Sequence, residues 1–210
     1  MNFEDFNQLV HARASHRKYS EDPVSDDEIR SIVETARVAP SGHNYQPWKF
    51  IAIRSKSIIQ KIDAALDKEL KTLYTGLPEE FVKKLEGYRF YFEHFKNAPV
   101  SIVVLTKKYF YKPIDSIPVE YGVELPKMEH FDMELLGIGA AIQNMLLAAQ
   151  AQGLASCWLV GPNIFAQKAI EEILEVEEGY NFISLVSLGR PTKVRTPAPK
   201  KELEEILTII

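Results

Sequence analysis

The longest helical pattern in this chain is EHFDMELLGIGAAIQNMLLAAQAQ, residues 129–152. Its apolar residues leave almost no polar face, so the helix must be covered on most of its sides. Gly153 follows directly, and a glycine at this place is typical of a helix C-terminus. A mostly apolar helix with several small residues favours a subunit interface as much as the core of one chain. The other elements have to be arranged around this helix.

Two glycines, Gly137 and Gly139, lie within the apolar helix. A dinucleotide-binding motif would need a preceding strand and a third glycine, and the sequence offers neither, so close helix packing explains the pair better. At the head of the helix lie His130, Asp132 and Glu134. The acidic residues favour the helix dipole, which accounts for this cluster without a metal ion. We therefore expect no metal site.

Four segments have the pattern of β-strands. The run PVSIVVLT, residues 99–106, is continuously apolar and rich in β-branched residues, which is typical of a strand covered on both faces. Similar signals predict strands at 47–54, 155–160 and 181–188. Apolar residues at helical spacing predict helices at 3–12, from Ser25 to Pro40, and at about 56–71, 78–95 and 164–175. Ser25-Asp-Asp-Glu28 has the form of a capping box at the start of the second helix.

Composition narrows the class of protein. The chain has 210 residues, 46% of them hydrophobic and 26% charged, which predicts one globular domain over residues 1–210. Its net charge of −4 argues against a nucleic-acid binder. No stretch approaches the roughly 20 apolar residues that span a bilayer, and the N-terminus lacks a signal-peptide pattern, so we expect a cytoplasmic protein without membrane contact. The single cysteine, Cys157, lies in an apolar run, which favours a buried packing role.

Two segments have no obvious place in a sheet-and-helix core. Residues 107–127 contain Pro113, Pro118 and Pro126 and keep no helical period, which predicts a lid-like insertion at about 107–130 or, equally, a disordered surface loop. Residues 190–210 form a C-terminal arm, in which three prolines precede an apolar end. Prolines keep such a segment extended, and its apolar end needs cover, so we expect the arm to wrap over a partner subunit.

Arg13-Ala-Ser15-His-Arg17 follows the first predicted helix. In an extended chain, alternating side chains share a face, so the two arginines and the hydroxyl would form a compact anion clamp. Guanidinium groups bind phosphate through planar, charge-assisted hydrogen bonds. The alternative is a solvated basic turn, and this short pattern does not decide between them.

Four motifs in order resemble the nitroreductase family of FMN-dependent flavoproteins. They are Arg13-x-Ser15-x-Arg17; Pro40-Ser-x-x-Asn44-x-Gln46-Pro-Trp48; Gly139-Ala-Ala-x-Gln143-Asn144 with Gly153-Leu-x-Ser156-x-Trp158; and Leu188-Gly-Arg-Pro191 with the arm beginning Pro199-Lys-Lys. The resemblance touches both ends and the middle of the chain and leaves out roughly residues 72–134. It implies an α+β fold with a central antiparallel-rich mixed sheet flanked by helices, assembled as an intertwined homodimer.

The same resemblance implies an FMN site shared between two chains. Arg13 and Ser15, with Ala14 between them, would hold the phosphate, and Arg17 would lie nearer the pyrimidine edge. The residues approaching from the partner chain would be Pro40, Ser41, Gly42 and Asn44. The backbone at Leu159, Val160 and Gly161 would face the flavin near N5. Lys200 would return to the phosphate, although lysine here lacks the bidentate fork of the arginine found in many relatives, which leaves Lys200 and Lys201 as alternatives.

The implied activity is an FMN-dependent oxidoreductase with no catalytic side chain. NAD(P)H would reduce the flavin and leave, and a nitroaromatic, quinone or related small-molecule acceptor would then take the reducing equivalents. Two alternatives stay open. The family includes reductive dehalogenating and flavin-cleaving enzymes, and in a dehalogenase Glu120, Tyr121 and Lys127 of the insertion would contact the substrate. The chain could instead be a non-catalytic flavin-binding protein.

Overall fold

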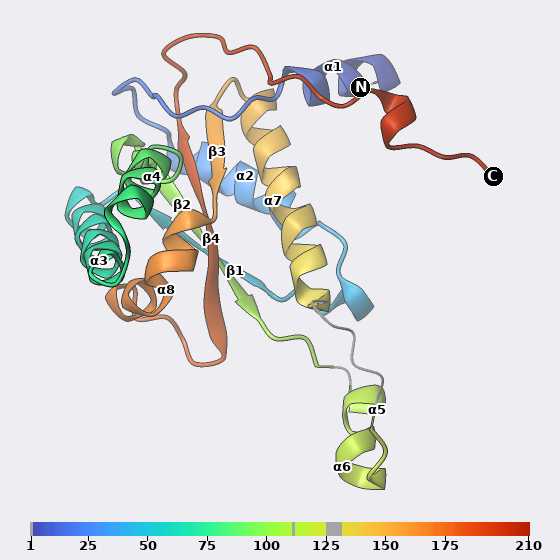
Figure 1. Cartoon of the computed structure of the whole chain (residues 1–210). Helices are drawn as coiled ribbons and strands as arrows, with labels where there is room; N and C mark the ends of the chain where they lie inside the picture. The colour runs from blue at the N-terminus through green and yellow to red at the C-terminus, as the bar shows by residue number, and fades with distance from the viewer. Residues whose placement is uncertain (1, 111, 125–131) are drawn as a thin grey trace.

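The computed structural model describes residues 2–110, 112–124 and 132–210 (Figure 1). In chain order, its helices, short 3₁₀ helices (η) and strands are α1 (Phe3–Ala12), α2 (Asp26–Arg37), η1 (Gly42–Asn44), β1 (Trp48–Ile53), α3 (Lys56–Tyr74), α4 (Glu79–Arg89), η2 (Glu93–Asn97), β2 (Val100–Lys107), α5 (Lys112–Asp115), α6 (Ile117–Tyr121), α7 (Met133–Ala151), β3 (Ala155–Leu159), α8 (Gly161–Ile173), β4 (Tyr180–Gly189) and η3 (Leu203–Glu205). The expected α+β class is confirmed.

The four strands form one sheet in the order β1-β2-β4-β3, and every neighbouring pair is antiparallel. Trp48 of β1 pairs with Thr106 of β2, and Ala155 of β3 pairs with Gly189 of β4. A parallel bridge from Ser15 to Ser156 adds the segment after α1 to the outer edge of β3. This bridge supplies the parallel part of the expected antiparallel-rich mixed sheet.

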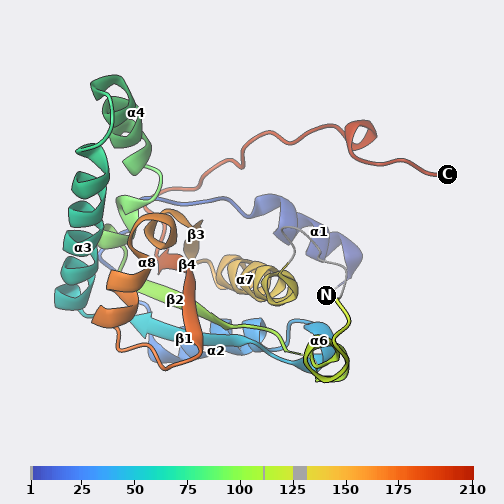
Figure 2. The ribbon, with the colours of Figure 1, turned by 60° about the horizontal axis from the view of Figure 1, so that its bottom comes forward.

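Helices cover both faces of the sheet, and α7 with α2 lies on the opposite side from α3 with α8 (Figures 1 and 2). Successive residues of β2 alternate between the two hydrophobic cores. Ile102 and Val104 pack with α2 and α7, whereas Val103 and Leu105 pack with α3 and α8. The continuously apolar run therefore belongs to a strand buried on both faces, as the sequence predicts.

Helix boundaries follow the capping signals closely. The Ser25 side chain accepts a hydrogen bond from the backbone N–H of Glu28, and the Glu28 carboxylate accepts one from the backbone N–H of Ser25, so the capping box is confirmed. Gly153 has φ of +70° directly after α7, the conformation that a helix-ending glycine adopts. Helix α8 begins at Gly161, three residues before the expected residue 164, because Pro162 is well tolerated in a first turn.

The prediction that no helix forms between residues 107 and 127 is wrong. Two short helices, α5 and α6, lie there and stand below α7 in Figure 1. Pro118 falls in the first turn of α6, where its missing N–H removes no intrahelical hydrogen bond. The rest of the predicted insertion, residues 125–131 with Lys127 and His130, lies outside the described residues.

The arm after β4 is extended except for the single turn η3. It leads past α1 and away from the sheet (Figure 2). Its apolar side chains are exposed in the isolated chain, with Ile206 at 68% and Ile209 at 87% of full exposure. Helix α1 likewise has no buried residue, and Phe3 is 78% exposed. Both segments therefore leave apolar surface uncovered.

Candidate functional site

The segment from Arg13 to Arg17 runs along the edge of β3. Ser15 forms the bridge to Ser156, and the backbone N–H of His16 donates a hydrogen bond to the Ser156 carbonyl over 2.9 Å. Ala14 is only 4% exposed. Since alternate residues of an extended segment face opposite ways, Ala14 anchors the segment in the protein while Arg13 and Ser15 face outward.

Tyr19 fixes the end of this segment to β4. Its hydroxyl donates to the His16 carbonyl over 2.7 Å and lies 2.6 Å from the Ser187 hydroxyl. Burial raises the pKa of Tyr19 above its ordinary value. Tyr19 also forms an antiparallel bridge with Pro191 at the start of the arm. The segment thus lies between β3 and the arm, and four residues beyond Pro191 the arm carries Arg195.

A cavity of about 370 Å³ opens beside this segment. Its lining residues are Arg13, Ser15, Gln143, Leu146, Trp158 and Val160. Three of them, Arg13, Ser15 and Val160, were named from the sequence as cofactor-binding residues. Gln143 and Trp158 stand within the quoted motifs but were not assigned to the site. The sequence carried no separate signal for them, because it is the structure that shows Trp158 41% exposed between buried neighbours of β3.

Positive charge gathers around this cavity. Burial, together with the charges of Arg195 and Arg13, lowers the pKa of His16. Burial raises the pKa of the Cys157 thiol, and Arg17, Arg195 and Arg13 act in the opposite direction. The charged groups acting on these two side chains are all arginines. A phosphomonoester carries a charge near −2 and accepts several hydrogen bonds, so the residues present fit the phosphate of FMN.

Arg17 is not among the residues that line the cavity, and it lies over Tyr91. Its guanidinium carbon is 5.4 Å from the centre of the Tyr91 ring, a cation–π distance. Its Nε atom is buried without a hydrogen-bond partner among the described residues. The pattern of alternating residues did not indicate the contact with Tyr91, and the role of Arg17 toward the pyrimidine edge stays a prediction.

The turn from β3 into α8 brings Val160 to the cavity and carries a backbone donor at the next residue, Gly161. Val160 is 45% exposed and lines the cavity, and Gly161 begins α8, where an N–H group has no acceptor within the helix. A Cβ atom on Gly161 would lie 2.3 Å from Cγ of Phe92, so only glycine fits there. The Leu159 side chain is buried in the core, and its carbonyl accepts a hydrogen bond from Ser184 over 3.0 Å.

The loop predicted to approach from a partner chain lies on another part of α7. In this loop, Ser41 Oγ accepts a hydrogen bond from the backbone N–H of Gln46 over 3.0 Å, and His43 and Asn44 have positive φ angles of 48° and 54°. Pro40, Ser41, Gly42 and Asn44 are not among the lining residues of the cavity.

Gly137 is the contact between this loop and α7. A Cβ atom there would lie 3.2 Å from Ser41 Cβ and 3.3 Å from the Pro40 carbonyl oxygen. Close packing, as expected for the Gly137 and Gly139 pair, is therefore confirmed for Gly137. Gln143, which lines the cavity, lies six residues further, about 9 Å along the helix and on a different face of it. The two groups of predicted site residues thus flank α7 and do not meet within one chain.

The remaining predicted residue, Lys200, lies on the exposed arm. The sequence analysis did not name Arg195, which lies on the same arm. The positive charge of Arg195 acts on His16 and Cys157. Across the described ranges there is no group of three or more histidine, cysteine or carboxylate side chains that could hold a metal ion. No helix in the same ranges is both long and apolar enough to cross a bilayer.

Two relatives of known name match most of this chain. A provisionally named NADH dehydrogenase/NAD(P)H nitroreductase from Archaeoglobus fulgidus is 31% identical over 90% of this chain and 86% of its own length. An iodotyrosine deiodinase from Haliscomenobacter hydrossis is 30% identical over 90% of this chain and 80% of its own length.

Solved structures share the whole fold. A BluB-like flavoprotein from Clostridium difficile matches with a TM-score of 0.87 and 29% identity, covering 100% of this chain and 99% of its own. A nitroreductase with bound FMN from Desulfitobacterium hafniense has the same fold, with a TM-score of 0.71 at 23% identity over 100% and 99% of the two chains. The sequence model of the nitroreductase family matches residues 10–190 of this chain. The chain therefore belongs to the nitroreductase family.

Proposed function

We propose that this protein is an FMN-dependent oxidoreductase that passes reducing equivalents from NAD(P)H to a nitroaromatic, quinone or related acceptor. The observation that carries the proposal is the cavity between Arg13, Ser15 and Val160, beside which the positive charges of several arginines converge. When bound, FMN would supply the redox chemistry through its isoalloxazine ring. The protein's part is to bind, orient and tune it.

Each part of the site has a physical role in this proposal. Arg13 and Ser15 would hold the phosphate, because charge-assisted hydrogen bonds from arginine and a neutral hydroxyl donor suit a phosphate dianion. Arg17 would place a fixed positive charge near the pyrimidine edge, where negative charge develops on reduction, and so favour the reduced state. The backbone N–H of Gly161 would orient the ring near N5. No side chain has to act as an acid or base.

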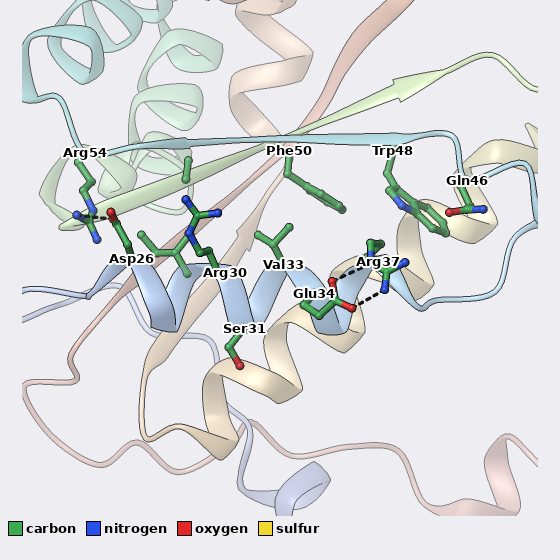
Figure 3. Close-up of a pocket in the computed structure, with 12 residues that line it drawn as sticks. Asp26, Arg30, Ser31, Val33, Glu34, Arg37, Gln46, Trp48, Phe50 and Arg54 are labelled. Carbon is green, nitrogen blue, oxygen red and sulfur yellow. Dashed lines mark hydrogen bonds and ion pairs between the residues drawn. The ribbon is translucent and has the colours of Figure 1, made fainter.

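The proposal includes a homodimer, because α7 separates the two groups of site residues within one chain. The arm of a second copy would occupy the groove between α2 and β1, whose volume is about 1060 Å³ (Figure 3). Val33, Trp48 and Phe50 form apolar walls of this groove. Among the described residues, strand β1 pairs with a neighbouring strand on one side only, and an extended apolar segment is a suitable occupant beside such an edge.

The decisive experiment starts with the visible spectrum of the purified protein. A flavin spectrum, loss of that spectrum on mixing with NADH or NADPH in the absence of air, and its return on adding an acceptor are the expected results. If FMN binds and neither nicotinamide bleaches it, the reductase proposal is wrong and a non-catalytic flavin-binding protein becomes the better description. Steady-state oxidation of NAD(P)H over a panel of nitroaromatics and quinones would then identify the acceptor class.

A second candidate is reductive dehalogenation, since two relatives carry the name iodotyrosine deiodinase, at 30% and 25% identity. Of the substrate contacts that this activity would need from the insertion, Glu120 and Tyr121 lie exposed on α6. Release of iodide from 3-iodotyrosine with dithionite as reductant tests this candidate directly. Either activity agrees with a cytoplasmic location, because a chain with one buried cysteine needs no oxidising compartment.

A further inference from the structure

A buried histidine lies behind the proposed flavin site. His94, in η2, is 4% exposed. Neither of its ring nitrogens has a hydrogen-bond partner of normal geometry among the described residues. Polar groups this deeply buried are usually paired, so an unpaired imidazole calls for an explanation. Nothing in the sequence motifs pointed to His94.

His94 shares its surroundings with Arg17. The Arg17 guanidinium lies over the ring of Tyr91, three residues before His94, at 5.4 Å from the ring centre. The Nε atom of Arg17 is, like the His94 ring nitrogens, buried and unpaired. The chain around η2 therefore supplies the aromatic surface on which Arg17 rests and, three residues further, a buried imidazole on which the charge of Arg17 acts.

The charge state of His94 follows from these neighbours. Burial first, and then the positive charge of Arg17, lower the pKa of His94 to about 4. The Tyr91 carbonyl and the Glu93 carboxylate favour a proton on the ring, but they are outweighed. At neutral pH the ring is therefore uncharged and keeps one nitrogen lone pair, which attracts an N–H donor. A charged ring at this position would repel Arg17.

We propose that His94 is a positioning residue for Arg17: the buried, neutral imidazole supports the guanidinium and so holds the positive charge at the pyrimidine edge of the flavin. This inference rests on the proposed function. It assigns no contact between His94 and the flavin, because both ring nitrogens are buried. Its effect on the cofactor passes through Arg17.

The test is a double-mutant cycle read on the reduction potential of bound FMN. The variants are His94→Phe, His94→Gln, Arg17→Gln and the double variant His94→Phe/Arg17→Gln. Arg17→Gln should lower the preference for reduced over oxidised FMN about tenfold, which is about 30 mV for a two-electron couple. His94→Phe should lower it in the same direction. In the double variant the His94 substitution should add nothing, because the charge that it positions is gone.

His94→Gln is the matched control, since it keeps a neutral hydrogen-bonding side chain and should stay within about twofold of the parent protein. FMN content and melting temperature are recorded for each variant. If His94→Phe does not fold, His94→Leu, which likewise has no hydrogen-bonding group, takes its place in the cycle. Additive effects of the two substitutions, or an unchanged potential in His94→Phe, overturn the inference while leaving the reductase proposal intact. Failure of the parent protein to bind FMN overturns both.

Discussion

Gly137 of α7 lies against Ser41 so closely that a Cβ atom on the glycine would stand 3.2 Å from the Ser41 Cβ. The Pro40 carbonyl oxygen lies 3.3 Å from the same point. The glycine thus sets how near the loop at residues 40–44 approaches the central helix. If this loop completes the flavin site of a second copy, its position controls cofactor binding.

Gly137→Ala should therefore weaken FMN binding, because the added methyl group pushes the loop outward. We expect about a tenfold rise in the dissociation constant, measured by quenching of FMN fluorescence. Gly139→Ala is the matched control, since a Cβ there meets nothing within 4 Å in the described chain. Within a helix, alanine is favoured over glycine by about 1 kcal/mol, so this control should be at least as stable as the parent. Equal effects of the two substitutions would contradict the explanation.

Arg195→Gln should weaken the binding of FMN but not that of riboflavin. The bridge between Tyr19 and Pro191 runs the arm antiparallel to residues 13–19, which brings Arg195 toward Ser15. Its charge acts on His16. If it reaches the phosphate, its loss should raise the dissociation constant of FMN about tenfold to a hundredfold, as for other charge-assisted hydrogen bonds.

Riboflavin lacks the phosphate, so its affinity is the internal reference for this prediction. Lys200→Gln measured in parallel decides whether Lys200 shares the role that the family resemblance implies for it. A loss of affinity for both flavins in Arg195→Gln would show that the substitution disturbs the whole site.

Stability should fall in acid because of His94. Its ordinary pKa is 6.5 and its pKa in the folded chain is about 4. Between these values the unfolded chain binds more protons than the folded one, so the free energy of unfolding decreases as pH falls from about 6.5 and the loss levels off below about 4. The contribution is at most about 3 kcal/mol.

Urea unfolding of the parent protein and His94→Gln at pH 7, 5.5 and 4.5 measures this contribution. The parent should lose more stability than the variant over this range, because other groups titrate in both. A parallel decline of the two proteins would show that His94 is not the group responsible.

Removal of residues 202–210 should shift the protein from dimer to monomer. The deleted end carries the exposed apolar side chains of Ile206 and Ile209, which the proposed groove would cover. Light scattering coupled to size-exclusion chromatography measures the mass. Phe50→Asp, in the opposite wall of the interface, should have the same effect. A truncated chain that remains dimeric would place the subunit contact elsewhere, with α1 as the next surface to test.

Much of the fold could be predicted because its signals are local. The β-branched run of β2, the capping box at Ser25 and the apolar residues of α7 each act within a few residues along the chain. The wrong prediction at α5 and α6 also came from a local signal. Three prolines were taken to exclude helix, but Pro118 is compatible with the first turn of a short helix.

The sequence by itself determined the family and the burial of Cys157, and its alternation predicted one shared face for Arg13, Ser15 and Arg17. Only the tertiary structure showed that Arg17 leaves this face for Tyr91, that its charge acts on His94, and that α7 keeps the residue 40–44 loop away from the cavity. The physical reason is how far along the chain each interaction reaches. Periodicity and capping are set by neighbours in sequence, whereas Arg17 and Tyr91, 74 residues apart in the chain, meet only because the sheet and its two helical layers pack together.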